Sequence, residues 1–224
     1  MESHRCPRLI QDLKNYLNQL RRRAIGEGLG RNKLEMTQLP FEQLDVYHGF
    51  KFVLEELGED ALDGCRPNDW VRACPKTRGP HGQERFDTVV VMRTDECEGT
   101  GLQGTRIGRL GLLFKLPQQV YGAFASPEYW PTELLAYIQW YTPLKTALEK
   151  DYLMYQVKKT PLRNVNMAPA DIVPISSICQ TCQLIPCFGT GGVPEEWRSE
   201  NVLDSCDRFW LNNWATKYSH QTLY

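Results

Sequence analysis

The segment from residue 171 to residue 189 limits most strongly what this chain can fold into. It reads DIVPISSICQTCQLIPCFG, so β-branched residues bounded by prolines are interrupted by Cys179, Cys182 and Cys187. These cysteines have two interpretations. Either they begin a metal site, or they are small apolar residues in strands that close a β-barrel. The choice between the two decides much of what the chain can do.

The metal interpretation requires ligands outside this segment. With Cys206 the cysteines have the spacing C-x2-C-x4-C-x18-C, whereas zinc sites usually present two pairs of closely spaced ligands. The second pair is missing, because Cys187 and Cys206 lie far apart in the sequence. Free cysteine is among the residues most often buried as a small apolar group. We therefore favour thiols in the protein core and predict neither a metal nor a cofactor, with zinc as the minority alternative.

Charge and hydropathy exclude several general roles. The chain has 26 Lys and Arg against 27 Asp and Glu, so attraction to nucleic acid or to acidic membranes must come from local clusters. It contains no apolar run of the ~18 to 20 residues that span a bilayer, and its N-terminus lacks the pattern of a signal peptide. We expect an intracellular protein, nuclear or cytoplasmic, with no membrane partner. The eight cysteines are scattered, which favours thiols over disulfides in that compartment.

Residues 1–38 are predicted to form a basic helical extension. Apolar residues recur at steps of three and four from residue 6 to residue 23, which is typical of an amphipathic helix. The helix ends in Arg21, Arg22 and Arg23, where cations complement the negative end of the helix dipole. Helix capping explains these arginines about as well as a contact with phosphate does. Binding of nucleic acid through them is kept as a weak alternative.

Residues 39–224 are predicted to form one mainly β domain. Four segments have the β-branched, aromatic or alternating composition of strands, namely residues 86–93, 106–116, 134–142 and 152–160. The C-terminal residues 195–224 carry apolar side chains at helix-like intervals. Several short strands between helical ends indicate an α+β fold that is mainly an antiparallel β-barrel, with helices at its N- and C-terminal ends.

Residues 106–116 show the clearest strand alternation. Leu110, Leu112 and Phe114 fall on one face, as expected for a half-buried antiparallel strand. Lone glycines in the same segment allow the tight bending that a small barrel requires. We expect Ile175 and Ile178, from the cysteine-bearing segment, to pack against this leucine face.

Aromatic residues beside the predicted strands suggest a binding pocket. Tyr137 and Tyr141 share one face of the segment 134–142, and Trp130 and Tyr155 flank it in sequence. If exposed, such rings bind a cationic methyl-lysine through cation–π attraction of about 0.5 to 2 kcal/mol per contact. The alternative for each ring is burial in the core, because aromatic residues supply large buried areas in every β domain.

Nothing in the sequence points to an enzyme. The four histidines, His4, His48, His81 and His220, have no sequence context that names a nucleophile or a metal partner. Neither a G-x-S-x-G nor an H-E-x-x-H motif is present. We therefore predict a protein without catalytic residues.

Four segments taken in order resemble the pattern of bromo-adjacent homology (BAH) domains: RIGRLGLLFKLP, LLAYIQWYT, LMYQVKKT and DIVPISSICQTCQLIP. More closely, the chain is similar to the C-terminal segment of Kyakuja-Dileera-Zisupton and related transposase-like proteins, which are abundant in mushroom-forming fungi. The motifs LDVYHGFKF, CQLIP, WRSENVLD and FWLN carry this likeness, which covers about residues 39–213. Gln183 stands where that family has a histidine, which weakens a metal site further.

The resemblance implies binding rather than catalysis. The acidic active site of such transposases lies upstream and has no counterpart in these 224 residues. Some BAH domains read methylated lysine through an aromatic cage, and Tyr137, Trp140 and Tyr141 lie where the strand pattern matches. We expect a non-catalytic, BAH-like chromatin or protein-interaction module, transposon-derived and nuclear, that docks a histone tail or another protein. The alternatives are DNA binding by the basic helix and a structural domain that assembles a transposase.

Overall fold

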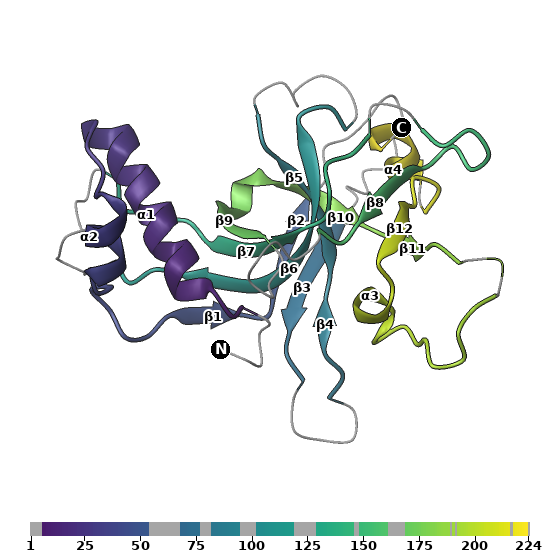
Figure 1. Cartoon of the computed structure of the whole chain (residues 1–224), viewed down its shortest axis with the longest axis horizontal. Coiled ribbons are helices and arrows are strands. Elements are labelled where there is room, and N and C mark those ends of the chain that lie inside the picture. Colours follow the sequence, from purple (N-terminus) through teal and green to yellow (C-terminus); the bar gives the residue numbers. More distant parts are fainter. Residues whose placement is uncertain are drawn as a thin grey trace.

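The computed structural model describes residues 6–53, 68–76, 82–94, 102–118, 129–145, 148–160, 169–188, 190, 192–215 and 217–223. Its centre is an antiparallel sheet in the order β10-β5-β6-β7-β9 (Figure 1). The longest strand is β6 (Thr105–Lys115), flanked by β5 (Thr88–Met92) and β7 (Leu135–Trp140). A short strand, β1 (Asp45–Tyr47), pairs with the C-terminal end of β6. His4 and His81 lie outside the described residues.

The edges of the central sheet are β9 (Ala170–Pro174) and β10 (Ile178–Cys182), which only the 3-10 helix η4 (Ile175–Ser177) separates in sequence. Four strand spacings of about 4.8 Å would place the two edges about 19 Å apart in a flat sheet. The linking residues span at most about 14 Å. The sheet must therefore curl strongly to bring its edges together.

The predicted closed barrel is wrong, because no pairing joins β9 to β10 among the described strands. The edge of β10 is satisfied by a side chain instead. The Asp69 carboxylate of β3 (Asn68–Cys74) accepts hydrogen bonds from the Thr181 backbone N–H at 2.6 Å and from its hydroxyl at 2.9 Å. A side chain from another sheet thus occupies the position that a closing strand would need.

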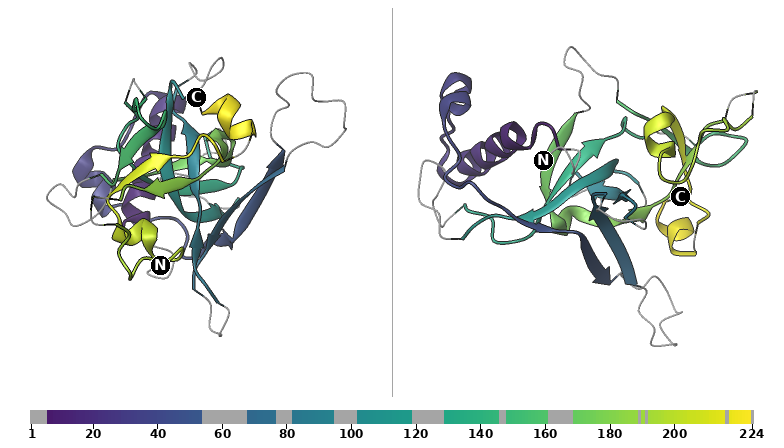
Figure 2. Two further views of the ribbon diagram at one scale, coloured as in Figure 1. Left: turned by 90° about the vertical axis from the view of Figure 1, so that its right-hand side faces the viewer. Right: turned by 90° about the horizontal axis from the view of Figure 1, so that it is seen from below.

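Two smaller antiparallel sheets complete the β structure of the described residues. One has the order β2-β3-β4, with β2 (Gly49–Val53) and β4 (Arg85–Phe86), and the other has the order β11-β12-β8. The second, called the C-terminal sheet here, consists of β11 (Leu184–Pro186), β12 (Arg208–Leu211) and β8 (Tyr155–Lys158). Figure 2 shows both sheets beside the central one. The prediction of a mainly β fold with antiparallel sheets is confirmed.

Helices lie at both ends of the chain. The predicted N-terminal helix is confirmed as α1 (Leu9–Ile25). The short helix α2 (Arg31–Met36) follows it. The C-terminal helices are only α3 (Val202–Ser205) and α4 (Lys217–Thr222) among the described residues. The helix-like interpretation of Phe209 and Trp210 is wrong, because β12 pairs with strands on both sides and buries alternate residues, including Phe209.

A β-bulge in β6 changes which of its side chains share a face. The register with β7 shifts between Leu110 and Leu112. Leu110 packs with Ile175 and Ile178 as predicted, whereas Leu112 and Phe114 belong to a different core cluster. The expectation that Ile175 and Ile178 also pack against Leu112 and Phe114 is therefore wrong. One extra residue in a strand moves every later side chain to the opposite face.

Gly108 of β6 is required for close packing. A Cβ at this position would lie 2.1 Å from Cγ2 of Ile138 and 3.1 Å from a ring carbon of Trp140. Its small size therefore makes room for β7 side chains, in addition to any bending of the strand.

One face of the central sheet, called the outer face here, is divided between two coverings. At one end α1 buries Leu9, Leu13 and Leu17 against Leu112, Phe114, Tyr137 and Ile172 of the sheet. At the other end the C-terminal sheet buries Val157, Phe209 and Leu211 against Val90, Ile107 and Tyr141. Figure 1 shows these two coverings on opposite sides of β6 and β7. A groove lies along the border of each covering.

Candidate functional site

The predicted pocket of exposed rings does not form, although Trp140 and Tyr141 both line one cleft. Tyr137, Trp140, Tyr141 and Trp130 are buried, and Tyr155 is half-buried. The five rings are divided among three separate core clusters. Burial in the core, the alternative left open for each ring, is therefore what four of the five show.

The polar atoms of these rings are used inside the fold. The Tyr137 hydroxyl donates to Asp12 Oδ2 at 3.2 Å, and burial raises the pKa of Tyr137 far above its usual value. The Trp140 indole N–H donates to Asp171 Oδ2 at 2.8 Å. The guanidinium groups of Arg93 and Arg106 lie 5.0 and 5.1 Å from a Trp140 ring centroid. Protein cations thus already occupy the position that a cationic ligand would take on Trp140.

In the opening segment Cys182 and Cys187 are free thiols, and the Cys179 thiol donates to the Ser177 carbonyl at 3.9 Å. Cys182 and Cys206 are buried in one core cluster, which Cys179 borders. Burial raises the pKa of the Cys182 thiol to about 12, so this sulfur stays protonated. Within the part of the chain that the structure describes, no three His, Cys, Asp or Glu side chains are grouped to hold a metal ion.

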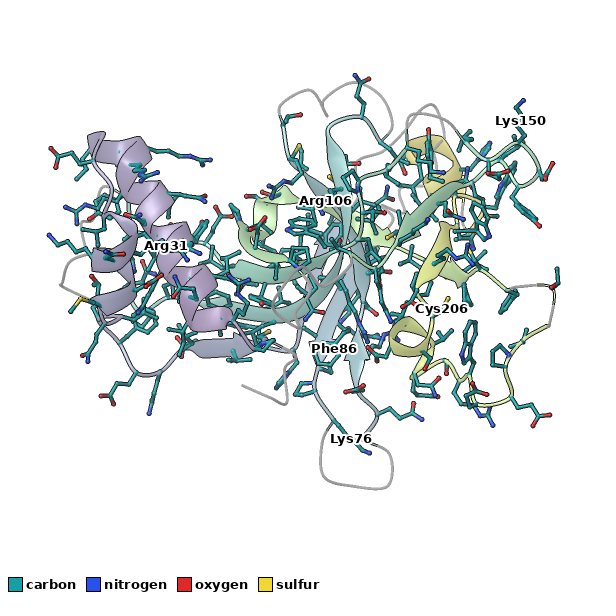
Figure 3. All side chains as sticks on the ribbon, in the orientation of Figure 1. Arg31, Lys76, Phe86, Arg106, Lys150 and Cys206 are labelled. Atoms are coloured by element: carbon teal, nitrogen blue, oxygen red, sulfur yellow. The ribbon has the colours of Figure 1, made fainter. Side chains whose placement is uncertain are left out.

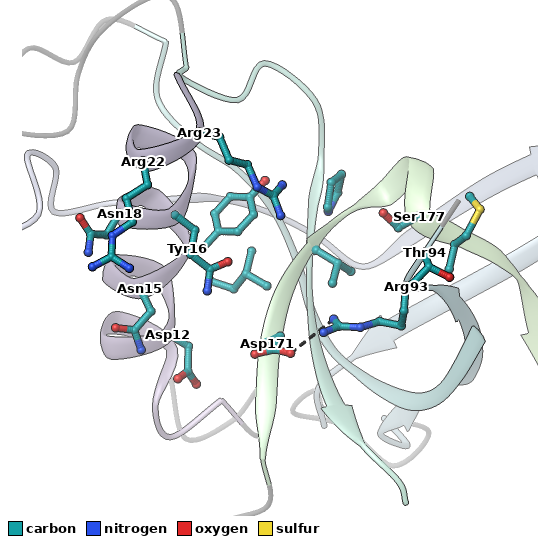
Figure 4. Close-up of a pocket in the computed structure, with 15 residues that line it drawn as sticks. Asp12, Asn15, Tyr16, Asn18, Arg22, Arg23, Arg93, Thr94, Asp171 and Ser177 are labelled. Atoms are coloured by element: carbon teal, nitrogen blue, oxygen red, sulfur yellow. Dashed lines mark hydrogen bonds and ion pairs between the residues drawn. The ribbon is translucent and has the colours of Figure 1, made fainter. Parts of the chain in front are cut away.

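Two of the three predicted arginines lie at a groove between α1 and β9, shown in Figure 4. Its volume is about 850 Å³. Arg22 and Arg23 from the last turn of α1 line it, and Arg93, which follows β5, lines it from the sheet. Arg21 is half-buried and is not among the described residues that line the groove. We call this the arginine groove.

The turn after α1 positions Arg22. Gly26 caps the helix in the left-handed conformation at φ 73°, and its N–H donates to the Arg22 carbonyl. A Cβ on Gly28 would lie 2.2 Å from Arg22 Nε, so a larger residue there would displace this flexible side chain. The glycine after the helix therefore leaves room for one of its cations.

Both carboxylates of the arginine groove already have partners. Asp171 forms an ion pair with Arg93 at 3.4 Å and accepts the Trp140 indole N–H. Asp12 forms an ion pair with Arg8 at 3.5 Å, and burial raises its pKa. Among the described residues, no carboxylate forms an ion pair with Arg22 or Arg23. The groove therefore presents positive charge to solvent.

Sequence reasoning missed Arg93, which lines the groove, and Arg106, which lies over the same Trp140 side chain as Arg93. Arg93 closes a buried strand, and nothing in its local pattern links it to the helix. Arg106 donates to the Tyr141 carbonyl at 3.0 and 2.9 Å, and burial followed by the nearby charge of Arg93 lowers its pKa. Figure 3 shows Arg106 at the centre of the molecule. Only the folded sheet brings these cations together.

Comparison of the chain with models of protein families, with curated proteins and with solved structures found no match. In the described residues, no helix has the length and apolar composition needed to cross a membrane. A proposal for function must therefore rest on the geometry of the chain itself.

Proposed function

We propose that this chain is a non-catalytic binding module that holds nucleic acid at the arginine groove. The observation that carries the proposal is that Arg22 and Arg23 of α1 line one groove together with Arg93, which follows β5. A phosphate backbone is recognised by guanidinium groups and by polar side chains around them. Asn15 and Gln19 add amide groups to the same groove.

The distribution of charge favours the same partner. Residues 6–36 carry seven Lys and Arg but only three Asp and Glu, whereas the whole chain has a net charge of −1. The positive charge is thus concentrated on the α1–α2 region of an otherwise acidic protein. Such a local basic surface steers a polyanion to one side of a molecule. It repels a lysine-rich tail at that site.

Fluorescence anisotropy with labelled double-stranded DNA over a series of salt concentrations tests this proposal. The double variant R22Q/R23Q should bind more weakly than the original chain. Its slope of log K against log salt should fall by about 0.9 for each phosphate that the variant no longer neutralises. The control variant K51Q/K150Q removes two exposed cations outside the groove and should retain the original slope. The proposal is contradicted if the affinity for DNA does not depend on salt concentration. It is also contradicted if both double variants weaken binding equally.

A protein partner with a cationic segment is the second candidate, and the surroundings of Trp70 favour it. This indole is 49% exposed, and it lines a hollow of about 800 Å³ whose charged lining residues are Asp69, Glu84, Asp87 and Glu200 together with Arg72, Arg85 and Arg109. An exposed aromatic ring beside carboxylates suits a lysine or arginine side chain. A histone tail is therefore proposed for this hollow in place of the buried rings of β7.

Titration with lysine-rich histone-tail peptides, modified and unmodified, tests the second candidate. W70A should abolish binding, whereas W214A should leave it intact, because Trp214 is 52% exposed and does not line the hollow. Equal binding by the two variants would exclude Trp70 as the residue that holds the peptide.

BAH-like identity, a transposase origin and a nuclear location are further proposals. The order of the motifs over residues 39–213 and the mainly β fold support them. A structural role in assembling a larger transposase is compatible with the same motifs.

A further inference from the structure

Arg109 is a buried cation on the outer face of the central sheet. The residue is 7% exposed, and its Nη1 donates to Asp204 Oδ1 of α3 at 2.7 Å. Its guanidinium also lies 5.9 Å from the centroid of the Phe86 ring. The Nε–H is buried and has no hydrogen-bond partner among the residues that the structure describes. Arg109 therefore retains an unused donor inside the fold.

An unused donor on a buried guanidinium is unusual. Arginine stays protonated in proteins, so it cannot relieve its burial by losing a proton. Leaving a buried charged group partly unsatisfied is costly, and such groups in native proteins are normally completed by a protein group, water or a ligand. The position of Arg109 thus indicates an oxyanion that would use more of its donors than Asp204 does.

A cleft opens beside this arginine, between the end of β7, the end of β8 and α3. Its volume is about 910 Å³, within the range of small-molecule sites. Arg109, Lys158, Lys159 and Arg208 line it, against only two carboxylates among the described residues. The cleft is therefore positively charged, although the whole chain is not.

Lys159 is held by the same residue as Arg109, namely Asp204. Its Nζ donates to the Asp204 carbonyl at 2.5 Å and lies 4.0 Å from the Asp207 carboxylate. Burial lowers the pKa of Lys159, whereas the charges of Asp207 and Asp204 act against that shift. The buried Arg109 and the half-buried Lys159 thus both donate to Asp204, which belongs to a helix of only four residues.

We propose that this cleft binds a small oxyanionic ligand, through a carboxylate or phosphate group held by Arg109 and Lys159. The Asp204 carboxylate, whose side chain is 37% exposed, occupies the oxyanion position in the free protein. The ligand displaces it from Arg109 and takes up further guanidinium donors. Lys158 and Arg208, which are exposed, attract the ligand at the rim. This site shares no lining residue with the arginine groove, so it does not depend on nucleic-acid binding.

Isothermal titration calorimetry with inorganic phosphate and with acetate, at constant ionic strength set by sodium chloride, tests the proposal. The original chain should bind at least one of the two, and the preferred anion identifies the phosphate or the carboxylate as the natural group. K159M should weaken binding about tenfold, the effect of losing one charge-assisted hydrogen bond. K51Q, which changes an exposed lysine outside the cleft, should bind as the original chain does.

The variant D204N gives the decisive result. It removes the resident carboxylate that competes for Arg109, so it should tighten phosphate or acetate binding about tenfold even if it lowers stability. A purely structural pair predicts the opposite, a loss of stability without any gain in anion affinity. The proposal is overturned if neither anion binds the original chain, if K159M binds as K51Q does, or if D204N fails to tighten binding.

Discussion

The two ends of the outer face bury charged groups of opposite sign, and they satisfy them differently. Under α1 the buried group is Asp12, which accepts a hydrogen bond from the neutral Tyr137 hydroxyl and lies 3.5 Å from the partly exposed Arg8 guanidinium. Under the C-terminal sheet it is Arg109, which is paired with the Asp204 carboxylate. A carboxylate can relieve burial by binding a proton, whereas a guanidinium cannot lose one. Burial is therefore eased at the α1 end by a raised pKa of Asp12, whereas the other end requires an anion beside Arg109.

The largest expected effect is on the apolar packing of the C-terminal sheet. Phe209 is fully buried between β11 and β8, so F209A should lower the free energy of unfolding by about 3 to 5 kcal/mol, measured by urea denaturation. F188A makes the same substitution at a side chain that is 49% exposed and serves as the control. If the two variants lost similar stability, the C-terminal sheet would not be part of the core.

The α1 end should respond slightly less. Leu17 is fully buried against the sheet, and L17A should cost about 2 to 5 kcal/mol in the same measurement. On the same helix Ile10 is 57% exposed, so I10A should cost far less. An unchanged m-value for L17A is expected, because α1 shares a core cluster with β6 and β7. A reduced m-value would show instead that α1 unfolds separately from the sheet.

The next effect separates the buried ion pair from an exposed one. D204A leaves Arg109 without its carboxylate and should cost about 1 to 3 kcal/mol, less than for a fully enclosed pair because Asp204 is 37% exposed. D207A removes a carboxylate that is 89% exposed and 4.0 Å from Lys159, and should cost about 0 to 1 kcal/mol. Equal losses by thermal or urea denaturation would mean that Arg109 does not require its partner.

These contrasts also show how far the sequence predicts the fold. The buried apolar face of α1 was predictable, because its apolar residues recur at the helix period and its arginines mark the C-terminal end of the helix. The strands β5, β6 and β7 were predictable from β-branched and alternating residues. Phe209 was misassigned, because a short apolar run fits a helix and a buried strand equally well. The bulge in β6 is equally hidden, since one extra residue leaves the composition of the strand unchanged.

The candidate sites depend on contacts that no local pattern contains. Arg109 and Asp204 are 95 residues apart, and Asp69 reaches the edge of β10 across 112 residues. Alternation in β7 correctly placed Tyr137 and Tyr141 on one face, but it did not reveal that other elements cover that face. Exposure is a property of the assembled layers, so the aromatic pocket failed while Arg22 and Arg23, at the solvent-facing end of a helix, remained exposed.

The smallest expected effect tests whether Asp12, unlike Arg109, is destabilised in its charged form. Burial raises the pKa of Asp12 above its usual value of 3.8, and the Arg8 charge and the Tyr137 hydrogen bond only partly oppose this. Between the unfolded and the raised folded pKa of Asp12, the folded protein binds more protons than the unfolded chain does. The contribution of Asp12 to stability is therefore highest at acidic pH and falls as pH rises through the folded pKa. The variant D12N retains an acceptor for Tyr137 without the charge. It should be more stable than the original chain at neutral pH by less than about 1 kcal/mol, because the helix dipole still favours a first-turn carboxylate.

Urea unfolding of both proteins between pH 3.5 and 7 measures this difference in stability, which should grow with pH. A difference that grows in favour of the original chain would mean that Asp12, like Arg109, is held in its charged form.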